Sequence, residues 1–213
     1  MKKVIAVLFL LFCVTGCQSL ESLNYDKIIE NGLAQNDLSN VLRTGYKYYL
    51  PKGATLLTNK EFNDEFLIED TRYYLYVDVV SYFNKVENQY IENPSMHYSS
   101  NFENGENYGF LQIKKMENEQ YFIEIMYNYA KIEVIVESSS IKRSLAYSMS
   151  VLSSIVYNDQ ILQNIMGDKM AVGNEIEYDI FATAGTENTF LEIISQDEYK
   201  EEESDIKDTD LIQ

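Results

Sequence analysis

Three strand-like segments joined by very short connections constrain the fold more than any other part of this chain. They are residues 109–115, 121–127 and 130–137. In the third segment Ile132, Val134 and Val136 share one face and Lys131, Glu133 and Glu137 the other, the two-residue period of a strand with one buried face. The connections at 116–119 and 128–129 are too short for anything but antiparallel neighbours. We therefore predict a three-stranded antiparallel meander.

An amphipathic stretch follows the meander directly. Serines at 138–140 are candidate helix caps. The apolar residues behind them recur every three or four positions and form one stripe of about four turns. They are Ile141, Leu145, Met149, Leu152, Ile155 and Val156. A one-sided sheet and a one-sided helix each need a cover, so we predict an α+β fold in which this C-terminal helix covers one face of the sheet.

A second, shorter helix is expected after Asn158 and Asp159, which end the first one. Its inward positions are Ile161, Leu162, Ile165 and Met166. Gly167 is its expected stop.

Strands are also expected before the meander, at residues 43–50, 66–68 and 72–80. In the last of these, Tyr73, Leu75, Val77 and Val79 share one face, whereas Arg72, Tyr74, Tyr76 and Asp78 share the other. The polar residues 84–107 are predicted to form a long surface loop.

The N-terminal residues have the pattern of an export signal. Lys2 and Lys3 precede an apolar run of 11 residues, which is shorter than the roughly 20 needed to span a membrane. The run ends in Val14-Thr15-Gly16-Cys17, which resembles the lipobox of bacterial lipoproteins. The resemblance implies cleavage before Cys17 and a diacylglycerol anchor, with palmitate-type acyl chains, on its sulfur, on the extracytoplasmic side of the cell membrane. An ordinary secretory signal is the alternative.

Charge argues against nucleic acid as a partner. Without Lys2 and Lys3 the chain has 15 basic and 34 acidic residues, a net charge of about −19, which phosphate backbones would repel. Residues 167–213 contain 14 acids and 3 lysines and are expected to be disordered. We thus expect a signal peptide at 1–17, a spacer with a short helix at 18–36, a single compact domain at 37–166 and an acidic tail at 167–213.

The meander and the following helix, which ends in residues 151–158, are similar to the closing segment of PsbP/Mog1-like domains. That resemblance covers about fifty residues and has no motif with chemistry. It implies a sheet-plus-helix fold of the kind that mostly serves accessory binding roles, which is an argument about fold and not about function.

Few residues point to catalysis. His97 is the only histidine, and no serine stands in a nucleophile elbow, so a solvated loop histidine is the simpler interpretation. With Cys13 in the signal and Cys17 lipidated, a zinc site lacks its ligands, and no cofactor motif is present. Asp78 could have a raised pKa suited to proton transfer, but an outward strand residue paired with Arg72 or water is the simpler interpretation.

Tyrosine is unusually abundant, with 18 residues and no tryptophan. Tyrosines on the face opposite the core could form a binding platform for a glycan, a peptide or a protein, although strand propensity alone also explains them. The candidate binding surface comprises Arg72, Tyr74, Tyr76, Asp78 and His97.

Two functions are consistent with the sequence. The first is a non-enzymatic, lipid-anchored envelope protein with an accessory or binding role beside a membrane protein or the cell wall. The Lys-, Ile-, Asn- and Tyr-rich composition suggests a Gram-positive source. The alternative is a carboxylate-based hydrolase of cell-wall glycan, which needs two acids at a fixed separation of roughly 5 to 10 Å. A two-lobed solute-binding protein does not fit one core of this size.

Overall fold

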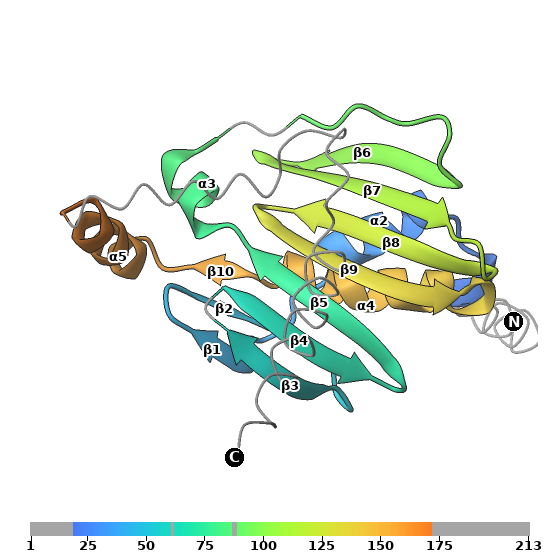
Figure 1. Ribbon diagram of the computed structural model, residues 1–213, viewed down its shortest axis with the longest axis horizontal. Coiled ribbons are helices and arrows are strands. Elements are labelled where there is room, and N and C mark those ends of the chain that lie inside the picture. The colour runs from blue at the N-terminus through green and yellow to red at the C-terminus, as the bar shows by residue number, and fades with distance from the viewer. Residues whose placement is uncertain (1–18, 61, 87–88, 172–213) are drawn as a thin grey trace, which may run out of the picture.

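The protein is built around a seven-stranded antiparallel sheet with helices on one face (Figure 1). The computed structural model describes residues 19–60, 62–86 and 89–171. The strands lie in the order β3-β4-β5-β9-β8-β7-β6. Their bounds are Thr55–Lys60 (β3), Asn63–Ile68 (β4), Thr71–Val77 (β5), Tyr98–Asn104 (β6), Asn107–Lys115 (β7), Gln120–Tyr127 (β8) and Ala130–Glu137 (β9). The predicted α+β class, with an antiparallel sheet covered by a helix, is confirmed.

The predicted meander is present as β7, β8 and β9. Strands β8 and β9 meet at a two-residue turn in which Asn128 and Tyr129 have φ values of 49° and 61°. Positive φ at both central positions is the turn geometry that matches the natural twist of a hairpin. It sets the register in which Tyr127 is opposite Ala130 and every second residue faces the core.

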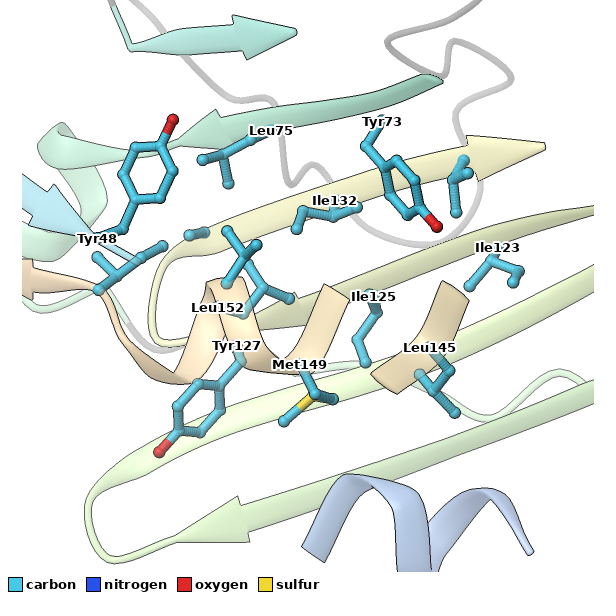
Figure 2. Packing of buried hydrophobic residues seen from close by; sticks show 14 of the residues in the cluster. Tyr48, Tyr73, Leu75, Ile123, Ile125, Tyr127, Ile132, Leu145, Met149 and Leu152 are labelled. Carbon is cyan, nitrogen blue, oxygen red and sulfur yellow. The ribbon is translucent and has the colours of Figure 1, made fainter. Parts of the chain in front are cut away.

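Helix α4 (Ile141–Ser153) covers the middle of the sheet. It follows directly on a single 3-10 turn, η2 (Ser138–Ser140). Figure 2 shows Leu145, Met149 and Leu152 of this helix among the buried side chains of the strands. The helix is shorter than predicted, because Ser154 ends it. The Ser154 hydroxyl donates to the Val151 carbonyl over 2.7 Å and accepts from the Tyr49 backbone N–H over 2.8 Å.

The short helix expected near the N-terminus is α2 (Tyr25–Leu33), which follows the 3-10 turn η1 (Leu20–Ser22). Asn24 caps α2 by accepting from the backbone N–H of Lys27. Ile28 and Ile29 are buried in the same core as α4. A Cβ at Gly32 would lie 2.5 Å from the Cβ of Met149, so only glycine permits this approach of the two helices. Helix α2 is therefore an integral part of the packed body.

The prediction of one strand over residues 43–50 was wrong. The chain turns back at Gly45, which has a φ of 88°, between β1 (Val41–Arg43) and β2 (Tyr46–Tyr48). With β10 (Val156–Tyr157) these strands form a separate three-stranded sheet, hereafter the small sheet, in the order β1-β2-β10. Glycine is required at the turn because φ is positive and because an added Cβ would meet Leu162 at 2.4 Å.

A buried acid connects the small sheet to the large one. Asp64 of β4 accepts from Arg43 Nε over 2.9 and 3.0 Å and from the Tyr48 hydroxyl over 2.6 Å. Burial first, and then this hydrogen bond to the carboxylate, raises the pKa of Tyr48 far above its ordinary value. The hydrogen bonds stabilise a charge that would otherwise be costly to bury.

Three further predictions were incomplete or wrong. The loop expected at 84–107 ends in an edge strand, β6, and β3 was not predicted. The strand expected over 72–80 stops at Val77 and is followed by helix α3 (Val79–Asn84). Helix α5 (Asp159–Ala171) is capped by Asn158, whose Oδ1 accepts from the Ile161 backbone N–H, but it continues through Gly167, its expected stop. The signal peptide and the acidic tail from residue 172 onward lie outside the described residues.

Candidate binding surface

The face of the large sheet opposite α2 and α4 carries the tyrosines that the sequence placed away from the core. On β5 the predicted alternation is present, since Tyr73, Leu75 and Val77 are in the core. Arg72 is exposed and Tyr74 half-buried, whereas Tyr76 is buried. We call this the outer sheet face and define it by alternate side chains of four strands. They are Arg72, Tyr74 and Tyr76 on β5, Ile135, Glu133 and Lys131 on β9, Phe122, Glu124 and Met126 on β8, and Phe110 and Gln112 on β7.

Three charged residues form an ion cluster at the centre of the outer sheet face. Glu124 and Glu133 are directly opposite each other on β8 and β9. Both contact the ammonium of Lys131, which lies 3.2 Å from Glu124 Oε1 and 2.8 Å from Glu133 Oε1. The Lys131 side chain is 5% exposed and that of Glu133 1% exposed. Like charges in cross-strand positions repel, so the shared ammonium is what makes this arrangement tolerable.

Burial and neighbouring charges shift the pKa values of two members of the cluster, Glu124 and Lys131. Burial raises the pKa of Glu124, and the ammonium of Lys131 only partly opposes this. Burial on its own lowers the pKa of Lys131, but the two carboxylates outweigh it and the pKa is raised. The ammonium is therefore held in its charged form, whereas burial favours the protonated form of Glu124.

An aromatic pair extends the outer sheet face toward β7. The ring of Tyr90, from the segment before β6, stacks on Phe110 with centroids 4.4 Å apart and planes 8° apart. The Tyr90 hydroxyl donates to Gln112 Oε1 over 2.8 Å, and its backbone N–H donates to the Tyr108 hydroxyl over 2.6 Å. These contacts place the segment after α3 over this strand, so that part of the predicted long loop is held against the sheet.

A surface pocket of about 360 Å³ opens at the end of this face beside the β4–β5 turn. Arg72 and Tyr74 of β5 line it together with Ile135 and Glu137 of β9, and Gln120 contributes from β8. The Arg72 guanidinium is also 2.6 Å from Glu65 of β4, which orients it along the sheet. The pocket thus offers an aromatic ring, an aliphatic side chain, and both donors and acceptors of hydrogen bonds. A small polar ligand or a peptide segment could bind to such a set of groups.

The other two residues of the predicted surface lie elsewhere. Asp78 is 1% exposed and caps α3, with Oδ1 accepting from the Ser81 backbone N–H over 2.8 Å. It is not the ion-pair partner of Arg72, which contacts Glu65 instead. His97 packs its ring against the edge of Tyr121, a residue of the helix-covered face, with centroids 4.9 Å apart. The structure thus groups Arg72, Tyr74 and Tyr76 and separates them from Asp78 and His97.

The ion cluster was missed although the sequence contained a signal for it. Lys131 and Glu133 point away from the helix-covered core, as the alternation along their strand predicts. Both are nevertheless buried, which the alternation does not predict. Glu124 and Glu133 are at matching distances from the turn at 128–129, so the turn alone predicts that they face each other. An opposed pair of acids beside one lysine is the pattern that could have revealed the cluster.

Comparisons with known proteins identify no relative of this chain, so its function has to be inferred from the sequence, the fold and this surface. The chain matches no protein-family model, and no similar protein was found among those with curated descriptions. Within residues 19–60, 62–86 and 89–171, no three residues of the His, Cys, Asp and Glu types are grouped so that they could hold a metal ion. The helices in this same part of the chain include none long and apolar enough to cross a bilayer.

Proposed function

We propose that this protein is a lipid-anchored component of the cell envelope with a non-catalytic accessory or binding role at the outer face of the cytoplasmic membrane. The observation that carries the proposal is the arrangement of Lys2, Lys3, the short apolar run and the lipobox ending in Cys17. A lipobox cysteine receives a diacylglycerol and hence two acyl chains, which is what stable membrane attachment requires. Tethering raises the effective concentration of the protein beside membrane-bound partners.

The outer sheet face and its pocket support a binding role. Tyr74 offers a large, rigid contact area at low entropic cost, and the neighbouring Arg72 can donate up to five hydrogen bonds. Both line the pocket, and both are positioned by a strand in the middle of the sheet. Residues on rigid strands keep their geometry better than residues on loops. A protein segment or a glycan of the envelope is the proposed partner class.

Replacing Cys17 with alanine is expected to abolish membrane attachment, because no other stretch of the chain resembles an anchor. The measurement is detergent partitioning of the protein from cells, together with the size shift of precursor processing with and without globomycin. The matched control is Cys13→Ala, which changes the other cysteine inside the apolar run and should leave processing intact. Unchanged partitioning of the Cys17→Ala protein would disprove the lipid anchor.

A photo-crosslinking residue at Tyr74 is expected to capture a membrane-protein neighbour in intact cells, because its side chain lines the pocket. The control is the same residue at Glu30, which is exposed on α2 on the opposite side of the sheet. Products identified by mass spectrometry should appear from position 74 and disappear when Arg72 is changed to alanine. Equal products from both positions would show that the outer sheet face is not the binding surface.

The alternative is a carboxylate-based hydrolase of cell-wall glycan, and one observation favours it. Glu124 and Glu133 form an opposed acid pair, and the pKa of Glu124 is raised as a general acid requires. Against it, both carboxylates contact Lys131, and neither lines the pocket. Release of wall fragments by the purified protein, lost in Glu124→Gln, would establish this function.

A further inference from the structure

We infer that the protein is held end-on at the membrane in one fixed orientation, so that its pocket lies close to partners at the bilayer surface. This inference rests on the proposed lipid anchor at Cys17. The 3-10 turn η1 begins at Leu20, three residues after that cysteine. Three extended residues span at most about 10 Å. The tether is therefore much shorter than the body that it holds.

The first turn is firmly attached to the body, so the body cannot swivel freely. Leu20 and Leu23 pack against the hydrophobic core. The Lys142 ammonium of α4 donates to the Glu21 carbonyl over 2.5 Å. At the start of α2, Tyr25 meets the Tyr98 ring edge to face with centroids 4.9 Å apart. These contacts transmit the position of the anchor directly to α4 and to the edge of the sheet.

One end of the molecule must then face the lipid. We call it the proximal end and define it by η1, the first turn of α4, and the β7–β8 and β4–β5 turns, which Figure 1 shows on one side of the molecule. Helix α4 leads away from it for 13 residues, a rise of about 20 Å, to the small sheet. The small sheet therefore forms the distal end, and Lys47 and Val156 lie opposite each other on it.

The proximal end carries charges of both signs, although the whole chain is strongly acidic. Exposed there are the basic residues Lys114, Lys115 and Arg143 and, in the two turns, the acids Glu69, Asp70, Glu117 and Glu119. Ion pairs of Lys115 with Glu119 and of Arg143 with Glu69 offset two of the acids at this end. Repulsion from anionic head groups, which a net negative surface would feel, is thereby reduced. Met116, at the tip of the β7–β8 turn, is an exposed apolar side chain at the same end.

The pocket also opens near the proximal end. Its lining includes Asp70 of the β4–β5 turn, Gln120 at the start of β8 and Ser140 just before α4. An occupant must therefore come within reach of the bilayer surface. The extracytoplasmic segment of a membrane-embedded protein meets that requirement, whereas wall polymer further out does not. The orientation thus narrows the partner to a membrane protein.

Depth measurements on the reconstituted lipoprotein test the orientation. The mature chain has no cysteine other than Cys17, so a single new thiol can be labelled selectively. Fluorophores are attached through Met116→Cys at the proximal end or Lys47→Cys at the distal end, both exposed positions. In phosphatidylglycerol vesicles containing a head-group nitroxide lipid, we expect quenching at position 116 to be several-fold stronger than at position 47. Equal quenching at the two positions would overturn the inference.

A longer tether supplies the matched control. Inserting about 20 Gly/Ser residues between Ser19 and Leu20 adds roughly 25 Å of flexible reach and should remove the difference between the two labels. The two proposals fail in different ways. A chain without the anchor does not bind the vesicles at all, whereas a chain with the anchor but no fixed orientation binds them and shows equal quenching at both positions.

Discussion

The folded protein is expected to unfold cooperatively as the pH rises from 10 to about 12. Several of its tyrosines are buried, and their sites cannot accommodate the charged phenolate that forms at high pH. Burial raises the pKa of Tyr73 from 10.0 to about 12. Burial also raises the pKa values of Tyr46 and Tyr48, with the Asp64 carboxylate acting in the same direction. A phenol in such a site binds its proton more tightly in the folded protein than in the unfolded chain.

The sign of the effect follows from linkage. A group whose pKa is raised by folding contributes stability that is complete below its unfolded pKa and is lost as the pH rises through its folded pKa. For Tyr73, which is 1% exposed, a difference of two pKa units corresponds to about 3 kcal/mol of the free energy of unfolding. Lys131 acts in the same direction, since its pKa is also raised above 10.5. A domain of ordinary stability, about 5–15 kcal/mol, cannot withstand several such losses.

The measurement is a pH titration that follows circular dichroism and the tyrosinate absorbance band together. We expect much of the phenol ionisation to coincide with loss of structure. Tyr73→Phe removes one buried phenol and should reduce the pH dependence of stability, at the cost of about 1 kcal/mol for its 2.9 Å hydrogen bond to Ser144. The matched control, Tyr49→Phe, changes a half-buried tyrosine. Full ionisation of all phenols near pH 10 in a still-folded protein would contradict the prediction.

Replacing Lys131 with methionine is expected to lower the free energy of unfolding by about 3–5 kcal/mol, the usual cost of removing one partner from a buried ion pair. Methionine fills similar space but removes the ammonium that Glu124 and Glu133 share. The two opposed carboxylates then repel each other in a site where water screens them poorly. Urea unfolding monitored by circular dichroism gives the value.

Glu124→Gln is the matched control for that variant. The change removes the acid whose pKa burial raises and leaves Lys131 paired with Glu133 at 2.8 Å. A neutral pair replaces a cluster with an excess negative charge, so stability should change by less than about 1 kcal/mol. If Lys131→Met were as mild as Glu124→Gln, the cluster would not be a significant contributor to the stability of the sheet.

The well-predicted parts of the fold are those with local signals. In the meander, alternation of apolar residues and two short connections determine direction and register together. The turn at Asn128 and Tyr129 needed no information from elsewhere in the chain. The stripe through Leu145, Met149 and Leu152 likewise identifies the buried face of α4 from spacing alone. Local geometry and burial agree in these segments, which is why sequence reasoning succeeded there.

The poorly predicted parts depend on neighbours far apart in the sequence. Residues 43–50 form a tyrosine-rich run, and the turn at Gly45 packs against Leu162 of α5 and brings β2 beside β10, both far along the chain. Strand β6 is largely polar, and its pairing with β7 supplies the order that its own pattern does not. Asp78 reads as an outward strand residue until the chain bends into α3 and uses it as a cap. In each segment a tertiary contact outweighs the local preference.

The amino-acid sequence by itself determined the class of fold, the direction of the central strands, the buried stripe of α4 and the signal that predicts a lipid anchor at Cys17. These properties depend on side-chain period, turn length and charge, all of which can be read along the chain. Only the tertiary structure decided which polar groups are buried, the grouping of Lys131 with Glu124 and Glu133, and the pocket beside Arg72 and Tyr74. Burial and electrostatic coupling depend on distances between segments that the chain order does not specify.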